Sequence, residues 1–111
     1  DLQIKYDDFD KVELKVAEVI DCKKVKGADK LLQFRLDAGD ENHRQILSGI
    51  AEFYPDPAAL IGKKVVIVAN LKPRKMRGQI SQGMILSAES PEGKLQIVEA
   101  PKEMPNGAGI A

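Results

Sequence analysis

The sequence predicts an all-β fold, a small barrel of short strands with one short helix. Apolar and polar residues alternate with a period of two in several short segments, which is the pattern of half-buried strands. Clusters of glycine, proline and aspartate separate those segments at intervals typical of small β-proteins. The length of 111 residues suits one hydrophobic core, so we expect a single domain over residues 1–111.

Two strands are expected in the first third of the chain. The first covers residues 12–20, where apolar and polar side chains alternate and the alternation then continues after a shift of phase. Residues 23–30 contain glycine and aspartate and predict a turn. The second strand covers residues 32–37 and ends at the Ala-Gly-Asp sequence of residues 38–40.

A third strand, a helical turn and a fourth strand follow. The third strand is predicted over residues 44–50. Residues 55–60 predict a single helical turn, because Asp56 suits the N-cap and Pro57 the first helical position. Residues 65–69 are continuously apolar and mostly β-branched, so we expect them to form the most buried strand.

The last third adds two further strands and a tail. Alternation returns over residues 84–88, a turn is expected at residues 91–93, and another strand at residues 95–98. Prolines and glycines predict an irregular, flexible tail over residues 101–111. Five or six strands with a helix after the third fit the five-stranded oligonucleotide-binding barrel (OB-fold). On pattern alone, that barrel is one option among several small β-folds.

Positive charge is concentrated in one interval of a chain that is neutral overall. No acidic residue occurs between Pro57 and Ala88, and this interval carries a charge of +6, whereas residues 1–56 carry −4 and residues 89–111 carry −2. Four of the cations fall within six residues: Lys72, Arg74, Lys75 and Arg77. Because like charges repel, this cluster favours a polyanionic or acidic partner. The alternative is a solvated loop that happens to be basic.

The residue types needed for catalysis and metal binding are scarce. One histidine, His43, and one cysteine, Cys22, leave no ligand cluster of the structural zinc type and no internal disulfide. Residues 62–64 (Gly-Lys-Lys) lack the spacing of a phosphate-binding loop. The aspartates of residues 7–10 suit the first turn of a short helix better than a cation site. We therefore expect no enzyme activity, no metal and no cofactor. The longest apolar run is too short to cross a membrane.

The distribution of aromatic residues favours one kind of nucleic-acid binding. Proteins that bind single strands without sequence preference stack bases on aromatic side chains. All five aromatic residues lie in the first half of the chain, away from the basic cluster: Tyr6, Phe9, Phe34, Phe53 and Tyr54. A cationic surface without aromatics suits folded RNA, held through its phosphates and its shape. A barrel that binds single-stranded DNA remains a weaker alternative.

Five segments carry a resemblance to a known family. They are DFDKVELKV at 8–16, ADKLL at 28–32, QILSGI at 45–50, NLKPRKMRG at 70–78 and SQGMIL at 81–86. In this order they resemble the tRNA-binding domain appended to the C-terminus of bacterial methionyl-tRNA synthetases, and its free-standing bacterial relatives. The resemblance spans the chain from about residue 6 to its end.

The resemblance implies an OB-fold barrel that binds the outer corner of tRNA by shape, with little base readout. It also implies a homodimer, and we expect residues 5–100 to form the barrel and residues 101–111 a tail with possible dimer contacts. The matching motifs assign tRNA binding to nine residues: Lys30, Asn70, Lys72, Arg74, Lys75, Arg77, Ser81, Gln82 and Met84.

Five of these residues have an alternative interpretation that is purely structural. Lys30 could cap a turn, and Asn70 could bond its own backbone after a strand. Ser81 and Gln82 could bind phosphate or could simply end a loop. Met84 alternates with an apolar neighbour, and this pattern favours core packing over RNA contact.

The hypothesis from the sequence is a non-catalytic, dimeric, cytoplasmic domain that raises the affinity of a synthetase for tRNA. The chain begins with Asp rather than Met, which favours an appended domain over a free-standing protein. No membrane and no small-molecule substrate are expected. The alternatives are a free-standing tRNA-binding protein and an interaction module that docks an acidic protein partner.

Overall fold

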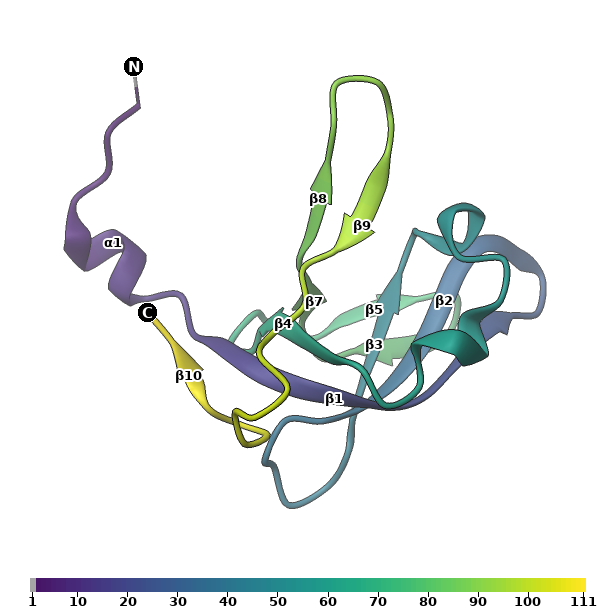
Figure 1. Ribbon diagram of the computed structural model, residues 1–111, viewed down its shortest axis with the longest axis horizontal. Helices are drawn as coiled ribbons and strands as arrows, with labels where there is room; N and C mark the ends of the chain where they lie inside the picture. Colours follow the sequence, from purple (N-terminus) through teal and green to yellow (C-terminus); the bar gives the residue numbers. More distant parts are fainter. Residues whose placement is uncertain (1) are drawn as a thin grey trace.

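The computed structural model describes residues 2–111 (Figure 1). Its helical elements are short: α1 (Tyr6–Asp10), η1 (Ala51–Phe53) and η2 (Pro57–Leu60). The strands of the main sheet are β1 (Leu14–Val25), β2 (Ala28–Asp37), β3 (Arg44–Ser48), β4 (Lys64–Val68), β7 (Met84–Ile85) and β10 (Gly109–Ile110). Two hairpins complete the fold, β5 (Arg74–Met76) with β6 (Gln79–Ser81) and β8 (Ser87–Glu89) with β9 (Leu95–Ile97).

Strand β1 is central to the barrel, because it is long enough to pair with two other strands, β4 and β2. Its first part pairs antiparallel with β4 from Leu14 to Glu18, and the rest pairs with β2 from Glu18 to Val25. The pairing with β2 shifts register between Val19 and Asp21, a little later than the phase slip that the sequence predicted before Val19. Such an irregularity bends a strand, and the sheet order β3-β2-β1-β4-β7 curls into the predicted OB-like barrel.

The barrel interior is filled by the residues whose alternation marked the strands. Val19, Leu32, Phe34 and Ile46 are almost completely buried together with Ile67 of β4. The helical turn expected at residues 55–60 is present as η2, and it lies between the third and fourth strands of the barrel, as predicted. Pro57 takes its first position, but the side chain of Asp56 makes no cap hydrogen bond.

Strand β4 is buried on both faces, as its continuous apolar sequence predicted. Val65 and Ile67 face the barrel core, whereas Val66 packs with Val16 and Ala100 in a second cluster on the outside of the sheet. The C-terminal residues cover this second cluster.

The tail is irregular over residues 101–108, as expected, but its last residues form a strand that pairs with the barrel. Strand β10 pairs with the start of β1, and the Gly107 amide donates to the Val16 carbonyl at 2.8 Å. Gly107 has a φ of 88°, and a Cβ there would lie 2.7 Å from the Ala38 carbonyl oxygen. Small residues therefore let the tail cross close over the end of β2, and this contact could not be read from composition.

The expected turn at residues 23–30 is also too long. Strands β1 and β2 continue through it and leave only Lys26 and Gly27 as the connection. Gly27 has a φ of 81°, which suits a tight hairpin turn. Propensity placed a loop here because lysines and an aspartate dominate the segment, but pairing with the partner strand overrides that preference.

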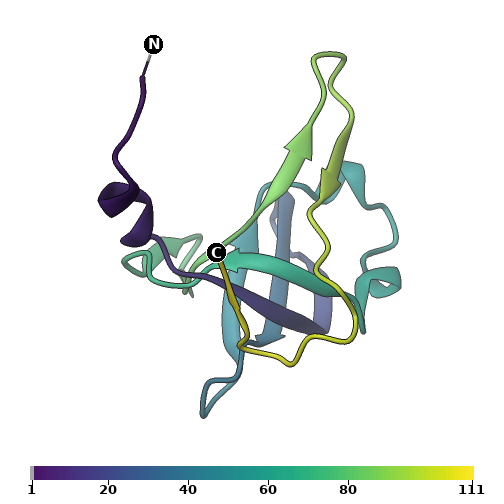
Figure 2. The ribbon, with the colours of Figure 1, turned by 60° about the vertical axis from the view of Figure 1, so that its left-hand side comes forward.

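Two parts project from the barrel (Figure 1, Figure 2). The N-terminal segment with α1 extends from one end, where β10 also ends, and the β8–β9 hairpin stands out from the sheet. No helix among residues 2–111 is long and apolar enough to span a bilayer.

Candidate nucleic-acid interface

The basic cluster lies on the β5–β6 hairpin and the loop that leads into it. The hairpin turns through only two residues, Arg77 and Gly78, with φ angles of 51° and 80°. Two positive φ angles are the backbone of the tight type I′ turn, which matches the right-handed twist of paired strands. The turn fixes Arg77 at the tip of the hairpin, where its side chain is exposed.

The four clustered cations are exposed and have no carboxylate partner. Among residues 2–111, the ion pairs within 4.0 Å are Lys11–Asp8, Arg44–Asp40 and Lys63–Glu99. None of them involves the cluster of Lys72, Arg74, Lys75 and Arg77. Their positive charge is therefore free to act on an anion from outside.

The cations do not all share one face. Strand alternation places Arg74 and Met76 on the inner face of the hairpin, and Lys75 with its cross-strand partner Ile80 on the outer face. Met76 packs against a small buried cluster that includes Leu47, and this contact holds the hairpin on the barrel. The hairpin is thus a thin ridge with positive charge on both sides and at its tip.

The fold brings Lys30 to this ridge from far away in the sequence. The turn between β1 and β2 lies beside β5, and residues 27–31 line a cavity of about 630 Å³ together with Arg74, Lys75 and Arg77. The sequence motif assigned Lys30 to the same function as the hairpin, and the structure places the two side by side.

Further lysines on the β1–β2 hairpin are exposed and were not singled out from the sequence. Lys23, Lys24 and Lys26 stand within eight residues that also include Lys30. The local run was visible, but the net charge of −4 over residues 1–56 concealed it. These lysines extend the positive surface beyond the β5–β6 hairpin.

The side chain of Asn70 makes two hydrogen bonds to the backbone of the segment after α1. Its side-chain amide donates to the Lys11 carbonyl at 2.6 Å and its oxygen accepts the Glu13 amide at 2.9 Å. Neither the expected bond to its own backbone nor a free amide is present. Asn70 ties the segment after α1 to the end of β4.

Ser81 and Gln82 complete the exposed edge of β3. The Ser81 hydroxyl is buried and accepts the Leu47 amide at 3.0 Å. The Gln82 side-chain oxygen accepts the Gln45 amide at 2.9 Å, and the Gln82 amide donates to the Gln45 carbonyl at 2.7 Å. These bonds satisfy the backbone groups of an edge strand, and they make Ser81 a closing residue of the barrel rather than a surface contact.

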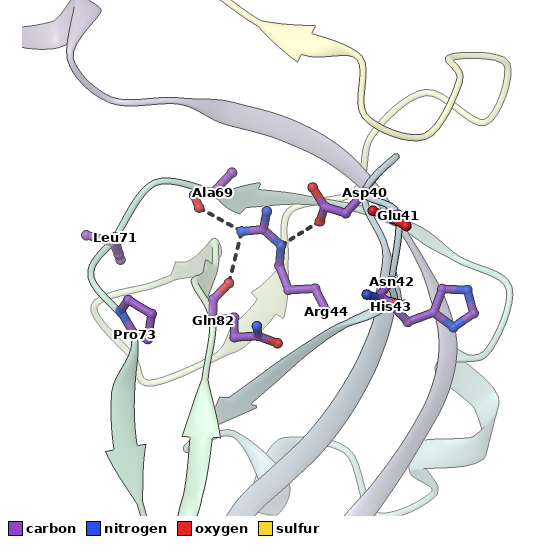
Figure 3. A pocket seen from close by; sticks show the side chains of 9 residues that line it. All are labelled: Asp40, Glu41, Asn42, His43, Arg44, Ala69, Leu71, Pro73 and Gln82. Carbon is purple, nitrogen blue, oxygen red and sulfur yellow. Dashed lines mark hydrogen bonds and ion pairs between the residues drawn. The ribbon is translucent and has the colours of Figure 1, made fainter.

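Arg44 holds the two ends of the hairpin segment together, a role that the sequence did not reveal. Its Nη1 donates to the Ala69 carbonyl at 2.7 Å and to the Gln82 carbonyl at 3.0 Å. Its Nε donates to Asp40 at 3.0 Å (Figure 3). One guanidinium thus joins the residue that precedes the basic loop to the residue that follows the hairpin.

Met84 lies at the surface, so the expectation of core packing is wrong. It is 47% exposed, whereas its neighbour Ile85 is 5% exposed. Strand β7 is only two residues long, and its register with β4 turns Ile85 inward. The opposite phase looked equally good in the sequence, because Met84, Ile85 and Leu86 are all apolar.

Three observations concern the residues that could take part in catalysis or metal binding. Within residues 2–111 no group of three or more His, Cys, Asp or Glu is placed to hold a metal. Cys22 is buried, and burial, with a contribution from the Asp21 carboxylate, raises the pKa of its thiol to about 12. His43 lines the shallow cavity beside Arg44 (Figure 3).

Comparison with known proteins identifies the family. Residues 14–109 match the family described as "Putative tRNA binding domain". The chain belongs to this tRNA-binding domain family. The match covers the barrel, the basic hairpin and the C-terminal strand, so the resemblance inferred from the sequence is confirmed.

The curated relatives are much longer enzymes. The chain is 80% identical to a methionine–tRNA ligase of Oceanobacillus iheyensis over 98% of its length, and 68% identical to that of Lactiplantibacillus plantarum over 97%. It spans only 16% of the length of either relative. The match is therefore to a tRNA-binding domain of these ligases and not to their catalytic core.

A solved structure shows the same fold. The MetRS-related protein from Pyrococcus horikoshii superimposes with a TM-score of 0.93 at 40% identity, and the alignment covers 100% of both chains. The predicted all-β barrel is confirmed by this likeness.

Proposed function

We propose that the chain is the C-terminal appendage of a methionyl-tRNA synthetase and captures tRNA on the β5–β6 ridge. The observation that carries the proposal is a ridge of exposed cations without carboxylate partners, beside which the fold has placed a further lysine. The residues proposed to bind are Lys30, Lys72, Arg74, Lys75, Arg77 and, as a contact in the adjoining groove, Met84.

The proposed mechanism is electrostatic capture positioned by shape. Phosphate contacts release counterions and supply affinity without sequence information. Where folded RNA brings phosphates close together, a thin ridge of protein can meet phosphates on both of its sides. The β5–β6 ridge has cations on both sides and at its tip. Asn70 and Gln82 support this surface by fixing the loop and the hairpin that carry it.

We also propose that the domain acts as a cytoplasmic homodimer, with residues 5–100 as the barrel and the 101–111 tail at the dimer contact. Apolar side chains on and around α1 are exposed without a partner in the chain: Ile4 68%, Tyr6 71%, Phe9 38% and Val12 40%. Strand β10 ends at the same end of the molecule (Figure 1) and leaves one edge unpaired among the described strands. A second copy would cover the apolar residues and this edge.

The test of the proposed surface is a quadruple variant, Lys72→Ala, Arg74→Ala, Lys75→Ala and Arg77→Ala. Because binding is dominated by phosphate contacts, affinity for bulk tRNA should fall at least about tenfold near 0.1 M salt, and the slope of log K against log salt should fall by roughly one per lost contact. Filter binding over a salt series measures both quantities.

A control removes three exposed cations that lie outside both the hairpin and the proposed dimer contact: Arg35→Ala, Lys63→Ala and Lys94→Ala. It should bind tRNA much more tightly than the hairpin variant. Unchanged binding by the hairpin variant would reject the surface and favour the alternative of an acidic protein partner. Loss for only one tRNA would indicate base readout, and competition by poly-dT as strong as by tRNA would indicate a single-strand binder.

A further inference from the structure

We propose that the groove between β3 and the β5–β6 hairpin binds a single unstacked nucleobase of RNA. The proposal rests on the proposed function and adds a subsite to it. It concerns the inner side of the basic ridge, whereas the cations at the tip and on the outer side need only phosphates.

The groove has an apolar floor and apolar walls. Its volume is about 600 Å³, and the buried side chains of Leu47, Ile50 and Ile85 form its base. Leu71 and Met84 line it as well and are each 47% exposed. Two large, partly exposed apolar side chains beside buried apolar ones make a lining that offers a phosphate no hydrogen-bond partner.

The rim of the groove carries the opposite chemistry. Lys72 and Arg74 stand at its edge, and no carboxylate is among the described residues that line it. Arg74 also lines the neighbouring cavity beside the β1–β2 turn, together with Lys30, Lys75, Arg77 and one carboxylate, Asp29. The groove therefore favours a ligand with a flat or apolar part that contacts the lining and an anionic part that contacts the rim.

A nucleotide with an unstacked base has this combination. The ring offers two apolar faces to Leu71 and Met84, since thioether sulfur contacts aromatic rings favourably, and the flanking phosphates reach Lys72 and Arg74. A base inside a helix has both faces covered by its neighbours, so only a base in a loop, bulge or end could enter. The positive rim disfavours a basic or neutral apolar peptide as the occupant.

A substitution at Gly49 can block the groove without changing the charge of the surface. It lines the groove, and a Cβ at this position would meet no atom within 4 Å. Its backbone does not lie in the left-handed region, so a larger residue is tolerated there. The variant Gly49→Leu should fill the groove and leave all the cations in place.

The experiment compares two RNA duplexes that differ in one nucleotide. One is fully paired, and the other carries a single bulged 2-aminopurine, whose fluorescence reports stacking. The wild-type chain should bind the bulged duplex about fivefold more tightly, which is the lower end of the range for stacking on aromatic side chains, because the described part of the chain places no aromatic residue in the groove. Binding should also change the 2-aminopurine fluorescence.

Two variants locate this preference. Gly49→Leu and Met84→Gln should bind the bulged and paired duplexes equally and should lose the fluorescence change. Ile61→Gln is the control, because Ile61 is 46% exposed and lies outside both the groove and the proposed dimer contact. Thermal unfolding confirms that each variant is folded, and Met84→Gln decides the test if Gly49→Leu is not.

The outcomes separate this inference from the proposed function. Equal binding of both duplexes by the wild type, or a preference that survives in both groove variants, overturns the nucleobase site and leaves phosphate capture standing. If the wild type shows no preference for the bulged duplex and an added apolar peptide abolishes the 2-aminopurine fluorescence change, the peptide occupies the groove. That result would assign the groove to a protein segment instead. Absence of binding to either duplex and to tRNA would overturn the proposed function itself.

Discussion

Arg77 combines an unfavourable backbone with an exposed charge. It is the only non-glycine residue with a positive φ within residues 2–111, and it occupies the first position of a turn where Asn, Asp or Gly is usual. The left-handed conformation costs roughly 1–2 kcal/mol for a residue with a Cβ of this kind. A strained cation at the tip of a basic hairpin supports the proposal that this side chain contacts RNA.

Replacement of Arg77 should separate stability from binding. Arg77→Asn relieves the strain and should raise the free energy of unfolding by about 1 kcal/mol. The same change should weaken tRNA binding and lower the salt slope by about one, since one phosphate contact is lost. Urea unfolding and filter binding measure the two effects.

The matched control is Arg77→Lys, which keeps the charge and the strain. It should leave stability unchanged and retain most of the affinity. If Arg77→Asn were more stable and bound tRNA as tightly as wild type, Arg77 would have no part in the interface.

Asp37 should make stability depend on pH on the acid side. The Gly39 amide donates to its carboxylate at 2.9 Å and the Asn106 side chain donates at 3.2 Å, and these bonds lower the pKa of Asp37. A pKa lower in the folded than in the unfolded state adds stability that is present above the unfolded pKa and is lost as pH falls through the folded pKa.

Asp37→Asn should therefore destabilise the domain most near neutral pH, with a difference from wild type that shrinks as the pH falls below the ordinary range for aspartate. Asn106→Ala should remove only part of this pH dependence, because the bond from Gly39 is the larger cause. Urea unfolding at several pH values measures the difference, and a constant difference at all pH values would contradict the prediction.

At the scale of elements, the basic hairpin depends on one arginine of a neighbouring strand. The Arg44 side chain is 14% exposed and donates to the carbonyls of Ala69 and Gln82, which stand before and after the hairpin segment. Loss of the donor would leave the Ala69 carbonyl unpaired in a part-buried setting and the exposed Gln82 carbonyl without its side-chain partner. The binding surface is thus positioned by a cation that does not belong to it.

Arg44→Met should destabilise the domain by about 2 kcal/mol, because the part-buried Ala69 carbonyl loses its donor. Amide hydrogen exchange in β5 and β6 should speed up more than exchange in β1 and β4. Arg35→Met, at an exposed arginine of β2, is the control and should cost much less. Equal exchange rates in the hairpin of both variants would show that Arg44 does not position it.

The strands differ in how far the sequence could place them. Residues 65–69 were placed within one residue, because an apolar, β-branched run suits only a buried strand. Strand β7 was given the wrong inward residue, because its two residues and their apolar neighbours carry no alternation. Short elements take their register from the partner strand, and here β4 decides it.

At the scale of the whole molecule, the fold of a chain with no net charge gathers positive side chains on one part of the surface. The N-terminal part is acidic on average, yet its β1–β2 hairpin carries lysines to the side of the basic ridge. A group of exposed apolar residues, Ile4, Tyr6, Phe9 and Val12, lies on and around α1, at the end of the molecule where the C-terminus also lies (Figure 2). The proposed dimer contact therefore lies on a different part of the molecule from the proposed RNA contact.

The double variant Tyr6→Ser and Phe9→Ser should convert a dimer into a monomer, because these side chains are 71% and 38% exposed in the single chain. Sedimentation equilibrium should give twice the chain mass of 12.2 kDa for wild type and the chain mass for the variant. Its affinity for tRNA should fall about tenfold or more as bivalent attachment is lost.

Ile61→Ser serves as the control, since Ile61 is 46% exposed and lies outside both α1 and the 101–111 tail. It should remain dimeric. A monomeric wild-type chain would reject the proposed dimer, and a dimeric double variant would move the contact away from α1.

The sequence by itself determined the features that depend on neighbours along the chain. Alternation placed the main strands, turn residues placed the β8–β9 hairpin, and charge counting found the cluster from Lys72 to Arg77. These features are local, so a few consecutive residues are enough to specify them.

Only the tertiary structure decided which polar groups are free. Asn70 is bonded to residues 57 and 59 positions away, and the Ser81 hydroxyl to a residue 34 positions away, so neither commitment can be seen along the chain. Lys30 joined the ridge by the same kind of long-range contact. A buried donor or acceptor must find a partner somewhere in the fold, and the path of the backbone through space, not the order of residues, decides which partner is within reach.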